Sequence, residues 1–103
     1  MTAVGLKLWL DDVRPAPDGW VHCTTAPAAI ALLSANDVDE ISLDHDLGPD
    51  ENGTGYDVLL WVERQVARWP HFIVPAIRVH TANPVARRRM LAALRSIRRL
   101  ASI

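Results

Sequence analysis

The sequence predicts an α/β fold built on a mainly parallel sheet of about four strands, with helices on the faces of the sheet. Short apolar runs alternate along the chain with longer segments whose apolar residues recur at helical spacing. This alternation is typical of parallel sheets. The chain has 103 residues, of which 50% are hydrophobic, enough for one ordinary core. We therefore expect a single domain over residues 1–103.

Composition narrows the classes of function and the compartment. The formal net charge of -1 argues against a broad electrostatic surface for duplex DNA, although a local basic patch lies near the C-terminus. Cys23 is the only cysteine, which excludes an intrachain disulfide and a cysteine cluster for zinc. The apolar start, interrupted by Lys7, is too short for a signal peptide or a membrane span. We expect a cytoplasmic protein with no membrane partner.

The first half of the chain is predicted to hold two strands and a helix. A strand over residues 6–10 ends in the pair Asp11-Asp12, and a second strand is expected over residues 20–24. Thr25 is suited to cap a helix that ends near residue 36. Only seven residues separate Asp12 from Trp20, fewer than the dozen or so of a usual parallel crossover. Either this link crosses without a helix, or the second strand is irregular.

The middle of the chain contains the most secure helix. A third strand over residues 40–44 is followed by a loop rich in glycine, proline and asparagine from Gly48 to Gly53. Thr54 and Asp57 have the spacing of a capping box. The helix after this cap carries one apolar stripe, formed by Leu59, Val62, Val66 and Trp69.

The last part of the chain is predicted to add a strand over residues 76–81 and a helix. Asn83 is suited to cap this helix, with Pro84 in its first turn and an end near residue 100. With right-handed crossovers all strands point the same way, and ligands of such sheets bind beyond the carboxyl ends of the strands. Polar side chains from separate segments should converge there: Asp11, Asp12, Asp44, His45, Asp46, His80 and Thr81.

The acidic residues of this edge suit a hard divalent cation. Mg²⁺ prefers oxygen ligands, and Asp11, Asp12 and Asp44 supply the two or three carboxylates that proteins usually contribute. In an extended strand Asp46 shares a face with Asp44, so it is a further candidate ligand. The alternatives are acids that cap nearby helices or pair with Arg14, or that simply lie at solvated strand ends.

Histidines at two strand ends indicate proton transfer. His80 and His45 have side chains that titrate near neutral pH, and we prefer His80 as the donor to a leaving oxygen. The alternative is a core or hydrogen-bonding role, which is our interpretation of His22 and His71. Among the tryptophans, we expect Trp20 to be able to flank the site and the others to pack in the core: Trp9, Trp61 and Trp69.

Arginines follow the cap of the last helix. Arg87 lies in the first turns, near the positive end of the helix dipole, where a bound anion would offset the repulsion. We expect Arg87 and Arg14 to bind phosphate. The remaining arginines of this helix are typical of a solvated face: Arg88, Arg89, Arg95, Arg98 and Arg99.

Four motifs cover nearly the whole chain: LWLDDVRPAP at residues 8–17, ISLDHDLG at 41–48, GTGYDVLLWVE at 53–63 and VHTANP at 79–84. An acidic pair, an aspartate and a threonine after successive strands resemble the layout of response-regulator receiver domains. The four motifs together are more similar to the cyclic-phosphate processing receiver-like domain. Unlike a full receiver, the chain has no fifth strand, and its only lysine, Lys7, lies in the first strand.

The resemblance implies a small three-layer receiver-like (flavodoxin-like) fold, truncated relative to a full receiver domain. It implies that Asp11, Asp12 and Asp44 bind Mg²⁺ or Mn²⁺, with Asp44 at the phosphoacceptor position and Thr81 and Asn83 beside the phosphate. The implied activity is a metal-dependent phosphoesterase, a hydrolase that opens a cyclic nucleotide or a 2′,3′-cyclic-phosphate RNA end. The alternative is a non-catalytic module that binds a phosphorylated ligand or a protein partner.

Overall fold

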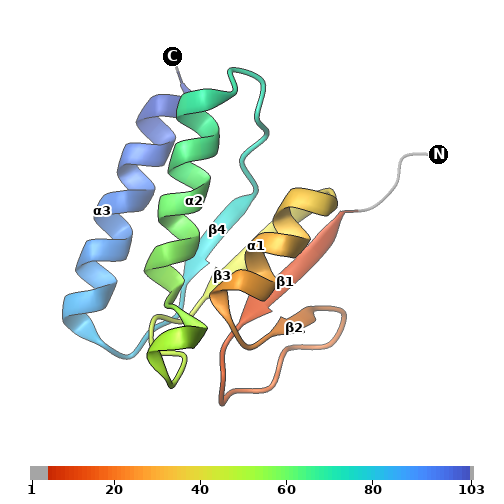
Figure 1. Cartoon of the computed structure of the whole chain (residues 1–103), viewed down its shortest axis with the longest axis vertical. Helices are drawn as coiled ribbons and strands as arrows, with labels where there is room; N and C mark the ends of the chain where they lie inside the picture. Colours follow the sequence, from red (N-terminus) through yellow and green to blue (C-terminus); the bar gives the residue numbers. More distant parts are fainter. Residues whose placement is uncertain (1–4, 103) are drawn as a thin grey trace.

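The computed structural model describes residues 5–102, which form one four-stranded sheet and three long helices (Figure 1). The strands are all parallel and lie in the order β2-β1-β3-β4, which confirms the predicted α/β class. None of the helices in these residues is long and apolar enough to cross a membrane. The elements are β1 (Leu6–Leu10), β2 (Val21–Cys23), α1 (Ala26–Ala35), β3 (Val38–Leu43), α2 (Gly55–Arg68), β4 (Ala76–Val79) and α3 (Pro84–Ala101).

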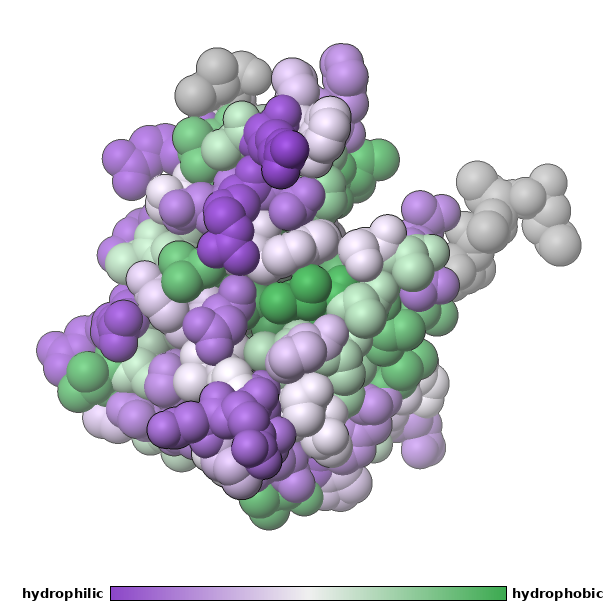
Figure 2. All heavy atoms as spheres, in the orientation of Figure 1, coloured by the Kyte–Doolittle hydropathy of each residue, from purple (hydrophilic) through white to green (hydrophobic). Residues whose placement is uncertain are grey.

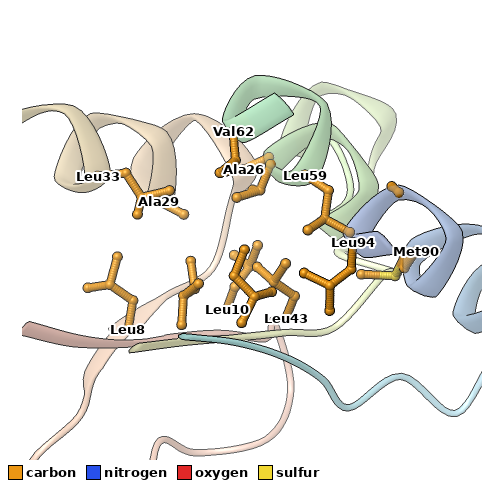
Figure 3. Close-up of a cluster of buried hydrophobic side chains, with 14 of the residues drawn as sticks. Leu8, Leu10, Ala26, Ala29, Leu33, Leu43, Leu59, Val62, Met90 and Leu94 are labelled. Atoms are coloured by element: carbon orange, nitrogen blue, oxygen red, sulfur yellow. The ribbon is translucent and has the colours of Figure 1, made fainter. Parts of the chain in front are cut away.

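All three helices lie over the same face of the sheet (Figures 1 and 3). Helix α1 packs on α2, and α2 packs on α3. Residues 5–102 therefore form two layers, whereas the sequence led us to expect three. The reason lies in the link between β1 and β2, because residues 11–20 make this crossover without a helix.

The core lies between the sheet and the helix layer (Figure 3). Leu8 and Leu10 of β1 and Leu43 of β3 point toward the helices and are fully buried. Burying a leucine side chain contributes about 1.5–3 kcal/mol, so this layer supplies most of the hydrophobic stabilisation. From the helices the fully buried partners are Ala29, Val58, Leu59, Val62, Met90 and Ile97.

The other face of the sheet carries polar and aromatic side chains. The register aligns Trp9 of β1 with His22 and Ser42 of its two neighbouring strands, and Ser42 in turn with Arg78. Side chains at paired positions share a face, since successive residues of a strand point to opposite sides. The predicted core role of Trp9 is therefore replaced by a place on this second face.

The predicted helix caps are confirmed. The Thr25 hydroxyl accepts a hydrogen bond from Ala28 N–H at the start of α1. Thr54 and Asp57 form the capping box of α2. Asn83 caps α3, with Pro84 in its first turn. These local signals survive because each is satisfied within a few residues of chain.

Several predicted boundaries shift. Strand β3 begins at Val38, because its pairing with Leu6 extends the ladder before Glu40. Strands β2 and β4 are shorter than expected, and the loop after β3 contains a 3₁₀ turn, η1 (Asp50–Asn52). Trp69 is the C-cap of α2 and is 54% exposed, so its predicted packing role is wrong. The following proline disfavours helical geometry at Trp69 and turns it out of the stripe.

Candidate functional site

Three carboxylates meet at the carboxyl edge of the sheet. Asp11 and Asp12 follow β1, and Asp44 follows the neighbouring strand β3. One carboxylate oxygen from each residue lies within 4.8 Å of the others. Asp11 is buried, Asp44 half-buried and Asp12 exposed, so the group is anchored on one side and open on the other. Three oxygen ligands with an open side fit a hydrated divalent cation such as Mg²⁺ or Mn²⁺.

Asp11 is held rigidly in its ionised form. Its Oδ1 accepts hydrogen bonds from the N–H groups of Val13 and Arg14, both at 2.8 Å, and its Oδ2 lies 3.0 Å from His80 Nε2. Burial at 1% exposure raises the pKa of this carboxyl, but the hydrogen bonds from Arg14, Val13 and His80 outweigh burial. The pKa of Asp11 therefore lies below its ordinary value.

His80 is engaged at both ring nitrogens. Its Nδ1 lies 2.7 Å from the Ser42 hydroxyl, and its Nε2 contacts Asp11. The ring also stacks on Trp9, with centroids 4.0 Å apart and planes 6° from parallel. A proton on Nε2 donates to the Asp11 carboxylate, which leaves Nδ1 to accept from Ser42. Sequence reasoning missed Ser42, although a buried hydroxyl in an apolar strand was an available signal.

His45 and Asp46 form a separate pair. His45 Nδ1 lies 2.8 Å from Asp46 Oδ1, and the side chains are 19% and 67% exposed. Asp46 is not in the group of three carboxylates, because β3 ends at Leu43 and the expected alternation does not continue to it. The His45 N–H donates to Asp44 Oδ1 at 2.8 Å. Among residues 5–102 no hydrogen bond involves His45 Nε2.

Two glycines let the surrounding loops approach the carboxylates. Gly48 has a φ of 87°, and a Cβ there would lie 3.5 Å from Asp12 Oδ2. A Cβ at Gly55 would overlap the carbonyl oxygen of Asp44, so the first turn of α2 packs directly on that backbone. The Gly55 N–H also donates to the carbonyl of His45 at 3.2 Å. Sequence reasoning did not select Gly55, since only the folded chain brings it to Asp44.

The expected phosphate-binding residues lie around the end of β4. Arg87 Nη1 donates to the carbonyl of Val79 at 3.1 Å, and Arg14 Nη1 lies 3.4 Å from the carbonyl of His80. Thr81 is buried, and its hydroxyl accepts from Asn83 N–H at 3.2 Å. The Asn83 side-chain carbonyl is occupied as the cap of α3. The two arginines are therefore the exposed cations nearest this strand end.

Two other features lie apart from the carboxylates. Trp20 packs edge-on against Trp9 with centroids 6.1 Å apart, and Lys7 lies 5.9 Å from the Trp20 ring. A pocket of about 520 Å³ is lined by Val38 and Pro75, near the amino ends of β3 and β4. None of the predicted site residues lines this pocket.

Comparison with protein families gives a match over residues 6–96 to the Cyclic-phosphate processing Receiver domain. The chain belongs to this family. The match covers most of the chain, including nearly all of the four motifs, and confirms the resemblance. No curated protein and no solved structure matches the chain significantly. In this cyclic-phosphate processing receiver domain, the three carboxylates and both strand-end histidines lie within the matched residues.

Proposed function

We propose that this receiver domain is a divalent-metal-dependent phosphoesterase that opens a cyclic phosphate, in a cyclic nucleotide or at a 2′,3′-cyclic RNA end. The observation that carries the proposal is the group of three carboxylates, Asp11, Asp12 and Asp44, beside two histidines at one sheet edge. The family description supports the cyclic phosphate as the substrate.

The three carboxylates would hold Mg²⁺ or Mn²⁺. When bound, such an ion polarises the phosphoryl group and makes a water more acidic. Asp11 is suited to this role because its hydrogen bonds keep it ionised and fixed. His80 acts as a positioning residue, since it orients Asp11 and is itself held by Ser42 and Trp9.

Arg14 and Arg87 would orient the phosphate and offset its charge. Both guanidinium groups are fixed by carbonyls near the end of β4, and arginine binds phosphate oxygens through paired N–H donors. Donors that are already in position stabilise charge as it develops on the phosphoryl oxygens.

Ring opening adds water across one P–O bond. The water oxygen joins phosphorus, the ring P–O bond breaks, and the departing oxygen gains a proton. We assign this proton to His45, because Asp46 on its Nδ1 fixes the ring and leaves Nε2 for transfer. His80 was the donor favoured on sequence grounds, but donation from it would break a bond to Asp11 or Ser42.

The proposal is tested with a panel of cyclic mononucleotides, cyclic dinucleotides and RNAs that end in a 2′,3′-cyclic phosphate. Each is incubated with the protein and Mg²⁺ or Mn²⁺, and in parallel with a chelator. We expect a linear phosphate product that depends on the metal. Saturable binding with unchanged ligand would instead identify a non-catalytic module that binds phosphorylated ligands.

A further inference from the structure

The charges of the chain are strongly segregated along the sequence. Residues 1–54 carry two basic and ten acidic side chains. Residues 55–103 carry nine arginines and two acidic side chains. The formal net charge of -1 therefore conceals an acidic half and a basic half. Such a distribution attracts polyanions to one part of the surface only.

The basic half is concentrated on α3, which contains six arginines and no acidic residue. An α-helix turns by about 100° per residue, which places five of these arginines within an arc of about 120°. This arc lies beside the buried side of the helix, and its side chains extend for about 18 Å along the axis. We call the five residues the arginine stripe: Arg87, Arg88, Arg95, Arg98 and Arg99, all exposed.

Two contacts fix the direction in which the stripe faces. Arg87 reaches the carbonyl of Val79 at the end of β4, beside the candidate site. Arg89, on another side of α3, lies with its guanidinium carbon 4.6 Å from the Tyr56 ring of α2. The stripe therefore faces away from α2 and begins at the site. Figure 2 shows hydrophilic residues, interrupted by hydrophobic ones, over α3 at the left of the view.

The stripe has no anionic partner within the described part of the chain. The ion pairs of residues 5–102 join Arg78 to Glu40, His45 to Asp46 and His80 to Asp11. Five neighbouring arginines on one helix side repel one another in low salt, and a row of phosphates removes that repulsion. All five are arginine rather than lysine, which favours paired hydrogen bonds to phosphate oxygens.

We propose that the arginine stripe binds the phosphate backbone of a single-stranded RNA whose 3′ end lies at Asp44. This inference rests on the proposed function, because a 2′,3′-cyclic phosphate requires a ribose with a 2′-hydroxyl, which DNA lacks. The acidic half of the chain repels the two phosphate rows of a duplex and leaves one narrow basic track. A strand that follows this track leads from the stripe to Arg87 and the carboxylates.

The test compares two matched pairs of substitutions. Arg95→Gln with Arg99→Gln removes two stripe charges, and Arg64→Gln with Arg68→Gln removes two exposed charges at the same spacing from α2. Fluorescence anisotropy follows a labelled RNA of about 12 nucleotides, long enough for a single-strand site. We expect at least tenfold weaker binding for the stripe pair and less than a twofold change for the α2 pair.

Salt dependence and turnover provide independent readouts. Loss of two phosphate contacts lowers the slope of log affinity against log salt by about 1.4. Turnover of a cyclic mononucleotide should stay unchanged in both double variants, because so small a ligand does not reach Arg95. Equal losses of RNA affinity in both pairs, or equally tight binding of DNA of the same sequence, would overturn the proposal.

Two further outcomes separate the stripe from its alternatives. Sedimentation without RNA tests whether the stripe binds the acidic half of a second copy. Self-association that the stripe pair abolishes, with RNA affinity unchanged, would overturn the RNA assignment. Stripe-dependent RNA binding by a protein that opens no cyclic phosphate would contradict the proposed function and support the stripe. Turnover by a protein whose RNA affinity ignores the stripe would overturn the stripe alone.

Discussion

At the scale of single residues, the site combines acids that sequence reasoning could find with neighbours that it could not. Asp11, Asp12 and Asp44 were predicted to meet because they follow parallel strands, and they do. Asp46 was expected beside them, but the chain leaves the strand at Leu43 and turns its carboxylate to His45. Contacts across strands, such as that of Ser42 with His80, depend on register and are not encoded locally.

Asp44→Asn should weaken Mg²⁺ or Mn²⁺ binding by at least tenfold, because it removes one of three clustered carboxylates. Isothermal titration calorimetry measures this affinity directly. Asp46→Asn is the control, since it removes the same charge two residues away from outside the cluster. Equal affinities for Asp44→Asn and wild type would exclude Asp44 from the metal site.

Asp11 should make folding sensitive to acid. Its folded pKa lies below the ordinary value of 3.8, so its contribution to the free energy of unfolding is fully present above that pH. As pH falls further, the unfolded chain binds the proton first and the contribution is lost. Urea unfolding of the chelator-treated protein should therefore show a smaller loss of stability below about pH 3.8 in Asp11→Asn than in wild type. An identical acid dependence of the two proteins would contradict this role.

The two histidines should separate in a comparison of turnover with metal affinity. His45→Ala should lower turnover by about 10²- to 10⁴-fold and leave Mg²⁺ affinity nearly unchanged, as loss of a proton donor does. His80→Ala should weaken Mg²⁺ binding by about 10- to 100-fold, because Asp11 loses its positioning partner. Wild-type turnover in His45→Ala, together with normal metal affinity in a slow His80→Ala, would exchange the two roles.

At the scale of elements, local signals were reliable and tertiary ones were not. Caps at Thr25, Thr54 and Asn83 were predicted because a side chain and nearby N–H groups suffice to form them. Strand ends moved because pairing with a neighbouring strand decides where a ladder stops. The start of α2 shows the same limit, since nothing in the sequence near Gly55 indicates that the backbone of Asp44 lies against it.

Gly55→Ala should destabilise the fold by about 2 kcal/mol or more, because the added methyl group overlaps the Asp44 carbonyl. In an ordinary helix this substitution would be stabilising, so the sign of the change identifies the contact. Chemical denaturation measures the free energy of unfolding. Gly19→Ala is the control, since its Cβ meets nothing within 4 Å and only its φ of 84° adds strain. A stabilised Gly55→Ala would show that the close approach is absent.

At the scale of the whole molecule, the parallel sheet was predictable and its covering was not. Alternating strands and helices indicated the sheet and the edge at which its site lies. The single helix layer follows from the helix-free link between β1 and β2, and the sequence suggested this irregularity through the short spacing alone. Net charge concealed the segregation of acids and arginines, which becomes informative once α3 is seen to begin at the site.

The central claim is that the clustered carboxylates support metal-dependent opening of a cyclic phosphate. The most direct measurement is ³¹P NMR of a 2′,3′-cyclic-phosphate substrate incubated with wild type and Asp44→Asn, with Mg²⁺ and then with excess chelator. The account predicts that wild type converts the cyclic signal to a phosphomonoester only with Mg²⁺, and that Asp44→Asn is at least a hundredfold slower. Conversion that continues in chelator, or that Asp44→Asn performs at the wild-type rate, would contradict it.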